Sequence, residues 1–287
     1  VQTLPTKDLY LNSQISILRL QNVKMSATLV KKMIPRTRKT LALTAIAAIV
    51  AIAAVASIWW YNTIPTAERG LTLIKTKTII IFGIISGGTL ALLALGFTLI
   101  YGVAGVVNMA HGSFFMLGAY IFYVFTSPKY LELNIFLAFT LAVISVGIIG
   151  AIIYRLTIHP VIEELTSLLV ITVGVALVFE RLMIIEFGPF HYPIPGFVGG
   201  YETILGVKVT YTRLLAFSVS LVLFAALWMF ISKSKMGRAM RAAAQDLEVA
   251  KLMGVNTGRL FMLTMALSSI LAATAGILIT ASTSGIA

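Results

Sequence analysis

The chain has 287 residues, of which 59% are hydrophobic and only 11% are charged, and its mean hydropathy is +0.98. No soluble domain of this length has so apolar a composition, so we predict an all-α, polytopic integral membrane protein. The absence of cysteine from the sequence excludes disulfides and thiolate metal sites.

Seven apolar runs of about 20 residues follow one another along the sequence, each long enough to cross a hydrocarbon core of roughly 30 Å. We expect each run to form a transmembrane helix. In chain order the runs are Leu41–Trp60, Ile79–Tyr101, Val106–Phe125, Ile135–Tyr154, Ser167–Ile185, Leu214–Ile231 and Leu260–Ala281.

The residues before the second run divide into a basic tail over 1–39 and an additional transmembrane helix over 40–61. A basic cluster at Lys31–Lys39 ahead of an Ala-rich apolar run is also the pattern of a signal peptide. This apolar run is longer than the 7–15 residues that are usual for a signal peptide. We therefore favour an uncleaved helix, with Met25 and Met33 as alternative starts of the chain.

The net charge of +12 suggests a nucleic-acid partner at first, yet the position of the cations fits membrane topology better. With the N-terminus inside, 15 Lys and Arg residues fall on the inner side and 6 on the outer side. Cytoplasmic loops of membrane proteins carry such an excess. The distribution predicts a multi-pass protein of the plasma membrane with a cytoplasmic N-terminus and no nucleic-acid partner.

No charged residue lies between Ile79 and Tyr123, so the second and third runs cannot be joined by an ordinary polar loop. A glycine-rich break at Gly102–Ser113 joins them instead. Irregular backbone at membrane depth is tolerated only where protein or a water-filled cavity surrounds it, so we expect this break to face the protein interior. The residues expected beside a translocation path are Gly105, Asn108, His111, Gly112 and Ser113.

Two spacing patterns refine this expectation. Asn108 and His111 are three residues apart, so they would share one face of a helix. Gly105 and Gly112 would permit close backbone approach within the break. A GxxxG pattern over 83–87 would let another helix approach the preceding run, although this pattern alone is a weak signal.

His111 is a candidate proton relay, metal ligand or hydrogen-bonded structural residue. A single His without Asp, Glu or Cys nearby in the sequence makes a poor metal site. We favour the structural role, in which the imidazole ties the break to a backbone carbonyl. A direct contact with the substrate or with a gate stays open, and the same two alternatives apply to Asn108.

Glu180 and Arg181 lie near the outer end of the fifth run, and charges inside a membrane are functional candidates by default. Adjacent residues on a helix do not face each other, and both side chains are long enough to reach the lipid headgroups. We therefore favour a role for both in anchoring the helix at the membrane interface.

The inner loop over 232–259 is predicted to form two short helices with a break near Gln245. Alanine and straight-chain residues favour helix, Asp246 is placed to cap a helix that begins at Leu247, and Gly254 is the residue type that ends one. An ordered, Arg-bearing helical pair on the inner face indicates that a partner docks there. Binding of Arg238 and Arg241 to anionic lipid headgroups is the alternative.

Several signatures of enzymes are absent from the sequence. It contains no G-x-x-x-x-G-K-[ST] motif that would cradle nucleotide phosphates, no H-E-x-x-H and no G-x-S-x-G. The chain therefore has no recognisable ATPase, protease or hydrolase site, and we expect neither an enzymatic activity nor a bound cofactor or metal. If ATP powers transport here, a separate subunit binds ATP with magnesium.

Two segments together resemble one known family. The segment Ala94–Tyr120, around Asn108-Met109-Ala110-His111-Gly112, is similar to the hallmark of the integral membrane permeases of high-affinity branched-chain amino acid ABC importers, a family that also includes urea and amide relatives. In the inner loop, Glu248-Val249-Ala250 with Gly254 six residues after the Glu resembles the EAA-x-x-x-G signature of ABC importer membrane subunits, with Val249 in place of the second Ala.

The resemblance implies an importer permease domain over 79–287, with a cytoplasmic coupling loop over 232–259 that inserts into an ATPase. It also implies two ATPase subunits, a second permease, an extracytoplasmic substrate-binding protein that delivers substrate to outer loops, and membrane lipid as partners. Family members usually continue past Ala287 through further membrane helices, so the expected match is partial. The residues implied in ATPase coupling are Arg238, Arg241, Asp246, Glu248, Ala250 and Gly254.

A self-contained secondary transporter or channel, with the Gly-broken helix as its binding site, is the competing interpretation. Such proteins usually have ionisable residues at the membrane midplane, and the sequence has almost none there. The outer segment Gly188–Phe197, rich in proline and aromatic residues, is either a stiff docking surface for the binding protein or a plain surface loop.

Overall fold

The computed structural model describes residues 52, 55, 66–162, 164–190 and 192–284 of the chain. The chain divides into two compact units, Val1–Leu73 and Ile74–Ala287, and the second unit contains the candidate sites. The predicted tail over 1–39 lies outside the described residues. The predicted additional helix over 40–61 also lies outside them, apart from Ile52 and Val55.

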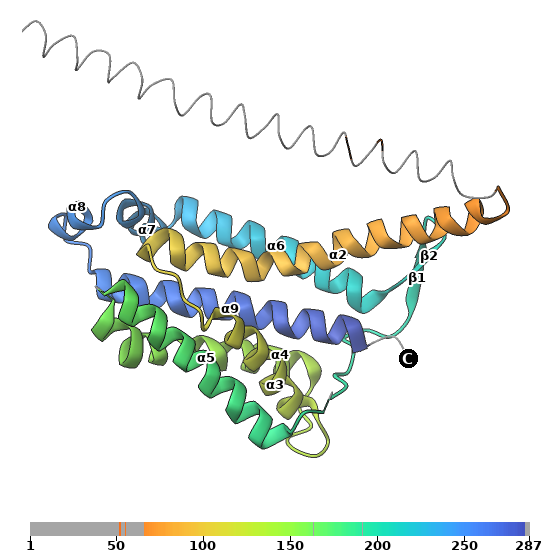
Figure 1. Ribbon diagram of the computed structural model, residues 1–287, viewed down its shortest axis with the longest axis horizontal. Helices are drawn as coiled ribbons and strands as arrows, with labels where there is room; N and C mark the ends of the chain where they lie inside the picture. The colour runs from red at the N-terminus through yellow and green to blue at the C-terminus, as the bar shows by residue number, and fades with distance from the viewer. Residues whose placement is uncertain (1–51, 53–54, 56–65, 163, 191, 285–287) are drawn as a thin grey trace, which may run out of the picture. The chain divides into compact units, whose positions relative to one another are not determined.

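The described residues form helices joined by short connections, with one small β-hairpin (Figure 1). The transmembrane-type helices are α2 (Thr66–Ala104), α3 (His111–Thr126), α4 (Ile135–Ile153), α5 (Leu165–Phe187), α6 (Tyr211–Lys233) and α9 (Thr257–Ser284). The remaining elements are the π-helical turn η1 (Tyr154–Ile158), the 3₁₀ turn η2 (His159–Val161), the strands β1 (Tyr201–Ile204) and β2 (Val207–Thr210), and the short helices α7 (Lys235–Gln245) and α8 (Leu247–Leu252).

Five of these helices are long and apolar enough to cross a membrane, whereas α3 has only 16 residues. The five spans are Ile74–Ala104, Ile135–Val161, Thr166–Phe187, Tyr211–Lys233 and Thr257–Thr283. The prediction of an all-α polytopic membrane protein is confirmed, but the predicted number of seven spans is not. The predicted start of the third run at Val106 is wrong, because the helix begins only at His111.

Helix α9 is the centre of the second unit. Within its most apolar window 67% of the residues are buried, against 11–28% in the other four spans. It packs against α3, α4 and α6, and Figure 1 shows it running between the α2–α6 pair and the group formed by α3, α4 and α5. The helix that matters most for packing is therefore the last one in the described sequence.

Small residues allow this close packing. A Cβ atom added to Gly118 of α3 would lie 2.6 Å from the Cα atom of Ala273 on α9, and one added to Gly276 of α9 would overlap the backbone of Phe115. In α2 an added Cβ would come too close to neighbouring atoms at Gly88 and Gly96. The close approach predicted for the GxxxG over 83–87 is wrong within this chain, because no described atom lies within 4 Å of a Cβ at either glycine.

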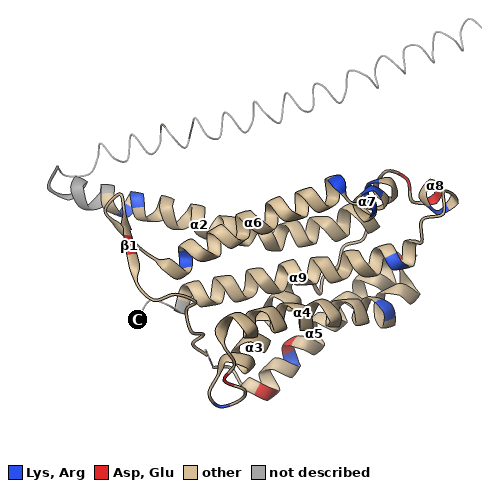
Figure 2. Cartoon of the chain, turned by 180° about the vertical axis from the view of Figure 1, so that it is seen from behind, with Lys and Arg blue, Asp and Glu red and all other residues tan. Residues whose placement is uncertain are grey.

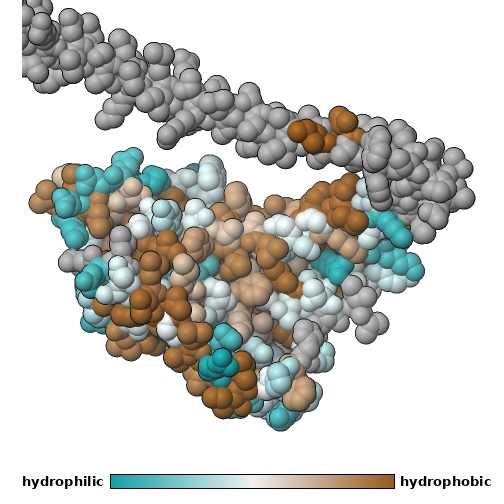
Figure 3. All heavy atoms as spheres, viewed as in Figure 1, coloured by the Kyte–Doolittle hydropathy of each residue, from teal (hydrophilic) through white to brown (hydrophobic). Residues whose placement is uncertain are grey.

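The outward faces of the spans are apolar, as a lipid-facing surface requires. Figure 3 shows brown, hydrophobic areas on the visible face of the second unit. Large exposed hydrophobic residues of the spans include Ile148, Val170, Leu177, Val222 and Trp228. Most Lys, Arg, Asp and Glu residues lie toward the two ends of the helices (Figure 2). This separation of apolar faces from charged ends is the arrangement expected of a membrane-spanning bundle.

The end of the unit opposite α7 and α8 carries the hairpin and a cluster of aromatic rings. The rings of Tyr123 and Tyr192 lie 4.8 Å apart, and those of Tyr120 and Phe187 lie 4.7 Å apart. The Tyr192 hydroxyl donates a 2.6 Å hydrogen bond to the Phe187 carbonyl. These contacts fix the described part of the Gly188–Phe197 segment against α3, so it is more than a loosely attached connector.

Candidate translocation and coupling sites

The break between α2 and α3 starts at a residue that only glycine occupies without strain. Gly105 has φ +69°, in the left-handed region, and its N–H donates to the Tyr101 carbonyl at 2.9 Å. From there the chain runs back along the bundle from the α7 end to the start of α3 (Figure 1). Val106 and Ala110 are buried in this segment, whereas Gly105 and Met109 are exposed. The prediction that the break faces the protein interior is therefore confirmed for only part of it.

Asn108 is 1% exposed and uses both ends of its amide. Its Oδ1 accepts a hydrogen bond from the Ala110 N–H at 3.0 Å, and its Nδ2 lies 3.4 Å from the Met265 sulfur on α9. The prediction that Asn108 and His111 share a helix face is wrong, because Asn108 precedes the helix. Instead the two residues contact Met265 and Ser268, which are themselves three residues apart on α9.

His111 connects three helices. Its Nε2 lies 2.9 Å from the Leu93 carbonyl of α2, and its Nδ1 lies 3.1 Å from the Ser268 hydroxyl of α9. That hydroxyl also donates to the Gly96 carbonyl at 2.8 Å. A carbonyl oxygen only accepts hydrogen bonds, so Nε2 carries the proton. The prediction that the ring is hydrogen-bonded to a backbone carbonyl is confirmed.

A metal role for His111 has no support in the described part of the chain. No group of three His, Cys, Asp or Glu residues suited to a metal ion occurs there. Both imidazole nitrogens already have protein partners, and the Phe97 ring packs edge-on at 5.9 Å. The arrangement holds α2, α3 and α9 in register at the break.

The other predicted residues of the break are placed differently. Gly112 is exposed, and no described atom lies within 4 Å of an added Cβ there or at Gly105, so the predicted close backbone approach is wrong at both. Ser113 is half-buried in the first turn of α3. A cavity of about 390 Å³ lies beside the break and is lined by Leu90, Leu93, Ala94, Phe97, Thr98, Asn108, Met109, His111 and Gly112.

Close approach occurs instead at Gly96, which sequence reasoning missed. A Cβ there would lie 2.8 Å from the Ser268 carbonyl and 2.9 Å from the His111 ring. Sequence reasoning also missed Met265 and Ser268. One signal was available, because Ser268, Ala272 and Gly276 are small residues spaced four apart, the pattern of a close helix–helix interface.

Helix α7 has a polar cap and one buried face. The Ser234 hydroxyl accepts a hydrogen bond from the Gly237 N–H at 2.8 Å, as N-cap residues do. Gly237, Met240 and Ala243 are buried, whereas Arg238 and Arg241 are exposed. The two guanidinium groups donate to the carbonyls at the end of α6, namely Lys233 and Ile231.

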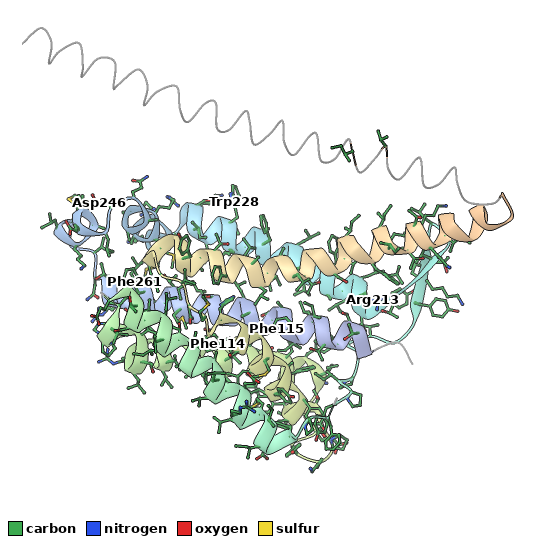
Figure 4. All side chains as sticks on the ribbon, viewed as in Figure 1. Phe114, Phe115, Arg213, Trp228, Asp246 and Phe261 are labelled. Carbon is green, nitrogen blue, oxygen red and sulfur yellow. The ribbon has the colours of Figure 1, made fainter. Side chains whose placement is uncertain are left out.

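Helix α8 is set off from α7 by its own cap, as predicted. The Asp246 carboxylate accepts hydrogen bonds of 3.0 Å from the N–H groups of Glu248 and Val249 (Figure 4 labels Asp246). Gly254 has φ +86°, and the N–H of Val255 closes the turn on the Ala250 carbonyl at 3.0 Å. The predicted helical pair, its break after Gln245 and its glycine stop are confirmed.

Ala250 is 3% exposed because it packs in the same apolar cluster as Met240 and Ala243. Its own chain therefore already covers Ala250, and the implied role of Ala250 in ATPase coupling stays a prediction. The most exposed large apolar residues of this turn are Leu252, 87% exposed, and Met253, 81% exposed. Sequence reasoning missed both, although two adjacent large apolar residues in a charged loop are a visible signal.

Glu180 and Arg181 are both exposed on α5, which suits the predicted interface anchoring and leaves it a prediction. Neither residue lines the cavity beside the break.

Comparison with known proteins places this geometry in a family. A family model described as the permease component of the branched-chain amino acid transport system matches residues 79–287. The chain belongs to this permease family. No solved structure matches the chain.

The permease family contains curated relatives at moderate identity. The high-affinity branched-chain amino acid transport system permease protein BraD of Pseudomonas aeruginosa is 30% identical over 209 residues, which cover 69% of this chain and 68% of BraD. The permease protein LivH of Escherichia coli K12 is 29% identical over 209 residues, with the same shares. A probable LivH of Methanocaldococcus jannaschii is 26% identical over 208 residues, covering 70% of this chain and 65% of the relative.

Proposed function

We propose that this permease chain forms part of the membrane path for branched-chain amino acids in an ATP-driven importer. The names of its relatives support the substrate class. Coupling to a separate ATPase through α7 and α8 is the mechanistic part of the proposal, and magnesium-bound ATP belongs to that partner. A second permease, an extracytoplasmic substrate-binding protein and membrane lipid complete the proposed assembly.

The exposed tip of α8 is the observation that carries the coupling proposal. Leu252 and Met253 are more than four-fifths exposed at the end of an ordered, capped turn. Large apolar side chains in this position are typical of surfaces that bind another protein. Glu248, also exposed, adds a charge at the rim of the same surface. We propose that this tip, rather than Ala250, enters the groove of the ATPase.

Movement of the tip has a route into the bundle. The buried residues Met240, Ala243 and Ala250 belong to the same apolar cluster as Leu260 and Met265 of α9. Met265 in turn contacts Asn108 of the break. Packed side chains compress very little. A displacement of α8 would therefore move α9 as a rigid element against the break.

The charges at the bundle ends support a cytoplasmic location for the α7–α8 end and a location of the protein in the plasma membrane. If all the predicted spans cross the membrane, the N-terminus is then cytoplasmic as well. The α7 end carries Arg155, Lys233, Lys235, Arg238, Arg241, Lys251 and Arg259. The opposite end, with the hairpin and the aromatic cluster, would then receive substrate from the binding protein.

Uptake in proteoliposomes tests the proposal. The chain is reconstituted with its cognate second permease, ATPase and binding protein, and uptake of radiolabelled L-leucine is followed with ATP, without ATP and with a catalytically inactive ATPase. We expect uptake only with ATP and the active ATPase. Uptake that follows an ion gradient in the absence of the ATPase would overturn the proposal in favour of a self-contained secondary transporter.

A further inference from the structure

A cavity of about 530 Å³ lies at the α7–α8 end of the bundle, behind α8. Its walls come from the end of α2, from the η1 and η2 turns, from α8 and from the first turn of α9. Phe261, labelled in Figure 4, forms part of the α9 wall. This volume lies within the range of roughly 300–1,000 Å³ that is typical of small-molecule sites.

The cavity exists because α4 does not continue as an α-helix. Pro160 lacks an N–H group and cannot extend a regular helix, and the chain widens into a π-helical turn whose His159 N–H bonds the Tyr154 carbonyl. Tyr154 is 4% exposed and lines the cavity, and its hydroxyl has no hydrogen-bond partner within the described ranges. A buried hydroxyl without a protein partner is uncommon, and this one leaves an unsatisfied polar group beside the cavity.

The cavity wall carries both signs of charge. Glu164 lies just before α5 and Lys251 on α8, and both residues are exposed at the cavity wall. The Glu164 carboxylate accepts a hydrogen bond from the Ser167 hydroxyl at 2.7 Å. Thr257 and Gly258 begin α9, whose N-terminal end adds partial positive charge to the cavity wall.

The lining also includes the polar side chains of Tyr154 and His159. Its apolar part is formed by Ala104, Val161, Ile162, Leu247 and Phe261. A carboxylate, an ammonium and an aliphatic surface around one small space match a zwitterion with an aliphatic side chain. We propose that the cavity binds the free aliphatic amino acid on the inner side of the membrane, with its carboxylate toward Lys251 and its ammonium toward Glu164. The choice of ligand rests on the proposed substrate class, whereas the charge arrangement does not.

Equilibrium binding to the isolated chain tests the site. The whole chain is purified in lipid nanodiscs without ATPase or binding protein, and binding of radiolabelled L-leucine is measured by scintillation proximity. Loss of one charged contact costs about tenfold or more in affinity. We therefore expect Lys251→Met and Glu164→Gln each to raise the Kd for leucine at least about tenfold, and Glu180→Gln, on the exposed face of α5, to leave it unchanged.

Analogues lacking one charge make the test specific. Leucinol has no carboxylate, so Lys251→Met should leave leucinol binding unchanged while Glu164→Gln weakens it. Isocaproate has no ammonium, so the effects should be reversed. Gly258→Val should fold normally, because an added Cβ lies at an ordinary contact distance of 3.5 Å from the His159 Nε2 atom. It should abolish leucine binding, because the larger side chain would occupy the cavity.

Each outcome decides the proposal. Wild-type chain that does not bind leucine, or variants that bind leucine, leucinol and isocaproate as the wild type does, would overturn it. Size-exclusion profiles and thermal unfolding of each variant separate lost binding from lost folding. ATP-dependent uptake by the complete wild-type system tests the proposed function separately. Normal uptake without leucine binding to the isolated chain would reject the proposed cavity site and leave the proposed function standing.

Discussion

Ser268 and His111 lie 157 residues apart in sequence, and the serine hydroxyl is 3.1 Å from the imidazole Nδ1. Nε2 of the same ring donates to the Leu93 carbonyl, so in the neutral ring Nδ1 accepts a hydrogen bond. The single hydroxyl proton of Ser268 therefore serves two acceptors, Nδ1 and the Gly96 carbonyl. This one side chain links α9 to both helices that flank the break.

The first prediction concerns the coupling of this pair. His111→Ala and Ser268→Ala should each destabilise the fold, and the double variant should lose less than the sum. The expected coupling is about 0.6–2 kcal/mol, the range for hydrogen bonds between membrane helices. Unfolding in mixed micelles measures it. Ser218→Ala is the control, because that hydroxyl bonds only within α6, and a coupling near zero would contradict the three-helix role of His111.

The second prediction compares two glycines. Gly276→Ala should destabilise the bundle by about 1–3 kcal/mol, because its Cβ overlaps the Phe115 backbone, which cannot move aside without shifting α3. Gly112→Ala should change stability little, because no described atom lies near its Cβ. Thermal unfolding of the two variants checks the order. A larger loss for Gly112→Ala would show that the break is packed more tightly than its contacts indicate.

The third prediction concerns the cap of α8. Asp246→Ala removes the acceptor of two backbone N–H groups and should cost about 0.5–2 kcal/mol of local helix stability. Asp246→Asn keeps an acceptor oxygen and should cost little. Amide hydrogen exchange over 247–252 measures the effect. Equal protection in all three proteins would mean that packing of Ala250, not the cap, holds this helix.

The fourth prediction concerns the exposed tip. Leu252→Glu together with Met253→Glu should abolish copurification of the ATPase while leaving the fold intact, because both side chains project from the bundle. Lys235→Glu, on exposed α7, serves as the charge control. Unchanged copurification of the ATPase with the tip variant would contradict the proposed coupling.

The fifth prediction separates bulk from backbone strain at Gly254. Any side chain is strained at φ +86°, so Gly254→Ala should loosen the end of α8 modestly. Gly254→Trp should in addition block the ATPase by steric overlap while membrane insertion stays normal. If both variants lose the ATPase equally, backbone geometry rather than bulk is responsible.

The topology yields a further test in this cysteine-free chain. Single cysteines at Lys129 and Glu202 should react with a membrane-impermeant thiol reagent applied from outside, and those at Lys235 and Thr257 should not. Intact cells give the labelling pattern, and permeabilised cells show that all four sites are reactive. Labelling of Lys235 from outside would overturn both the orientation and the coupling mechanism built on it.

Local signals in the sequence predicted the helical pair well. The caps of α7 and α8 depend on Ser234, Asp246 and Gly254, whose preferences act within three or four residues. Five of the seven predicted spans correspond to described helices long enough to cross a membrane, because lipid contact selects long apolar runs. The loss of helix over 106–110 was not predicted in full, since the position of a break depends on Gly105 and on the buried partners of Asn108.

Tertiary packing explains what sequence reasoning missed. The spacing of Ser268 and Gly276 indicates a close helix–helix interface, but the sequence does not say that α2 and α3 are the helices that pack there. Ala250 matched a docking signature, yet its burial depends on the neighbours Met240 and Ala243. In both cases the deciding partner lies on another helix, which no local pattern specifies.

The central position of α9 also sets an order of events during synthesis. A ribosome adding 5–20 residues per second reaches Ser268 about 8–30 s after His111. Throughout that interval Asn108 and His111 lack their α9 partners, and Gly118 faces no helix. The helices α2 to α4 are therefore synthesised before the helix that completes their buried polar contacts, so these contacts form only after α9 has been made.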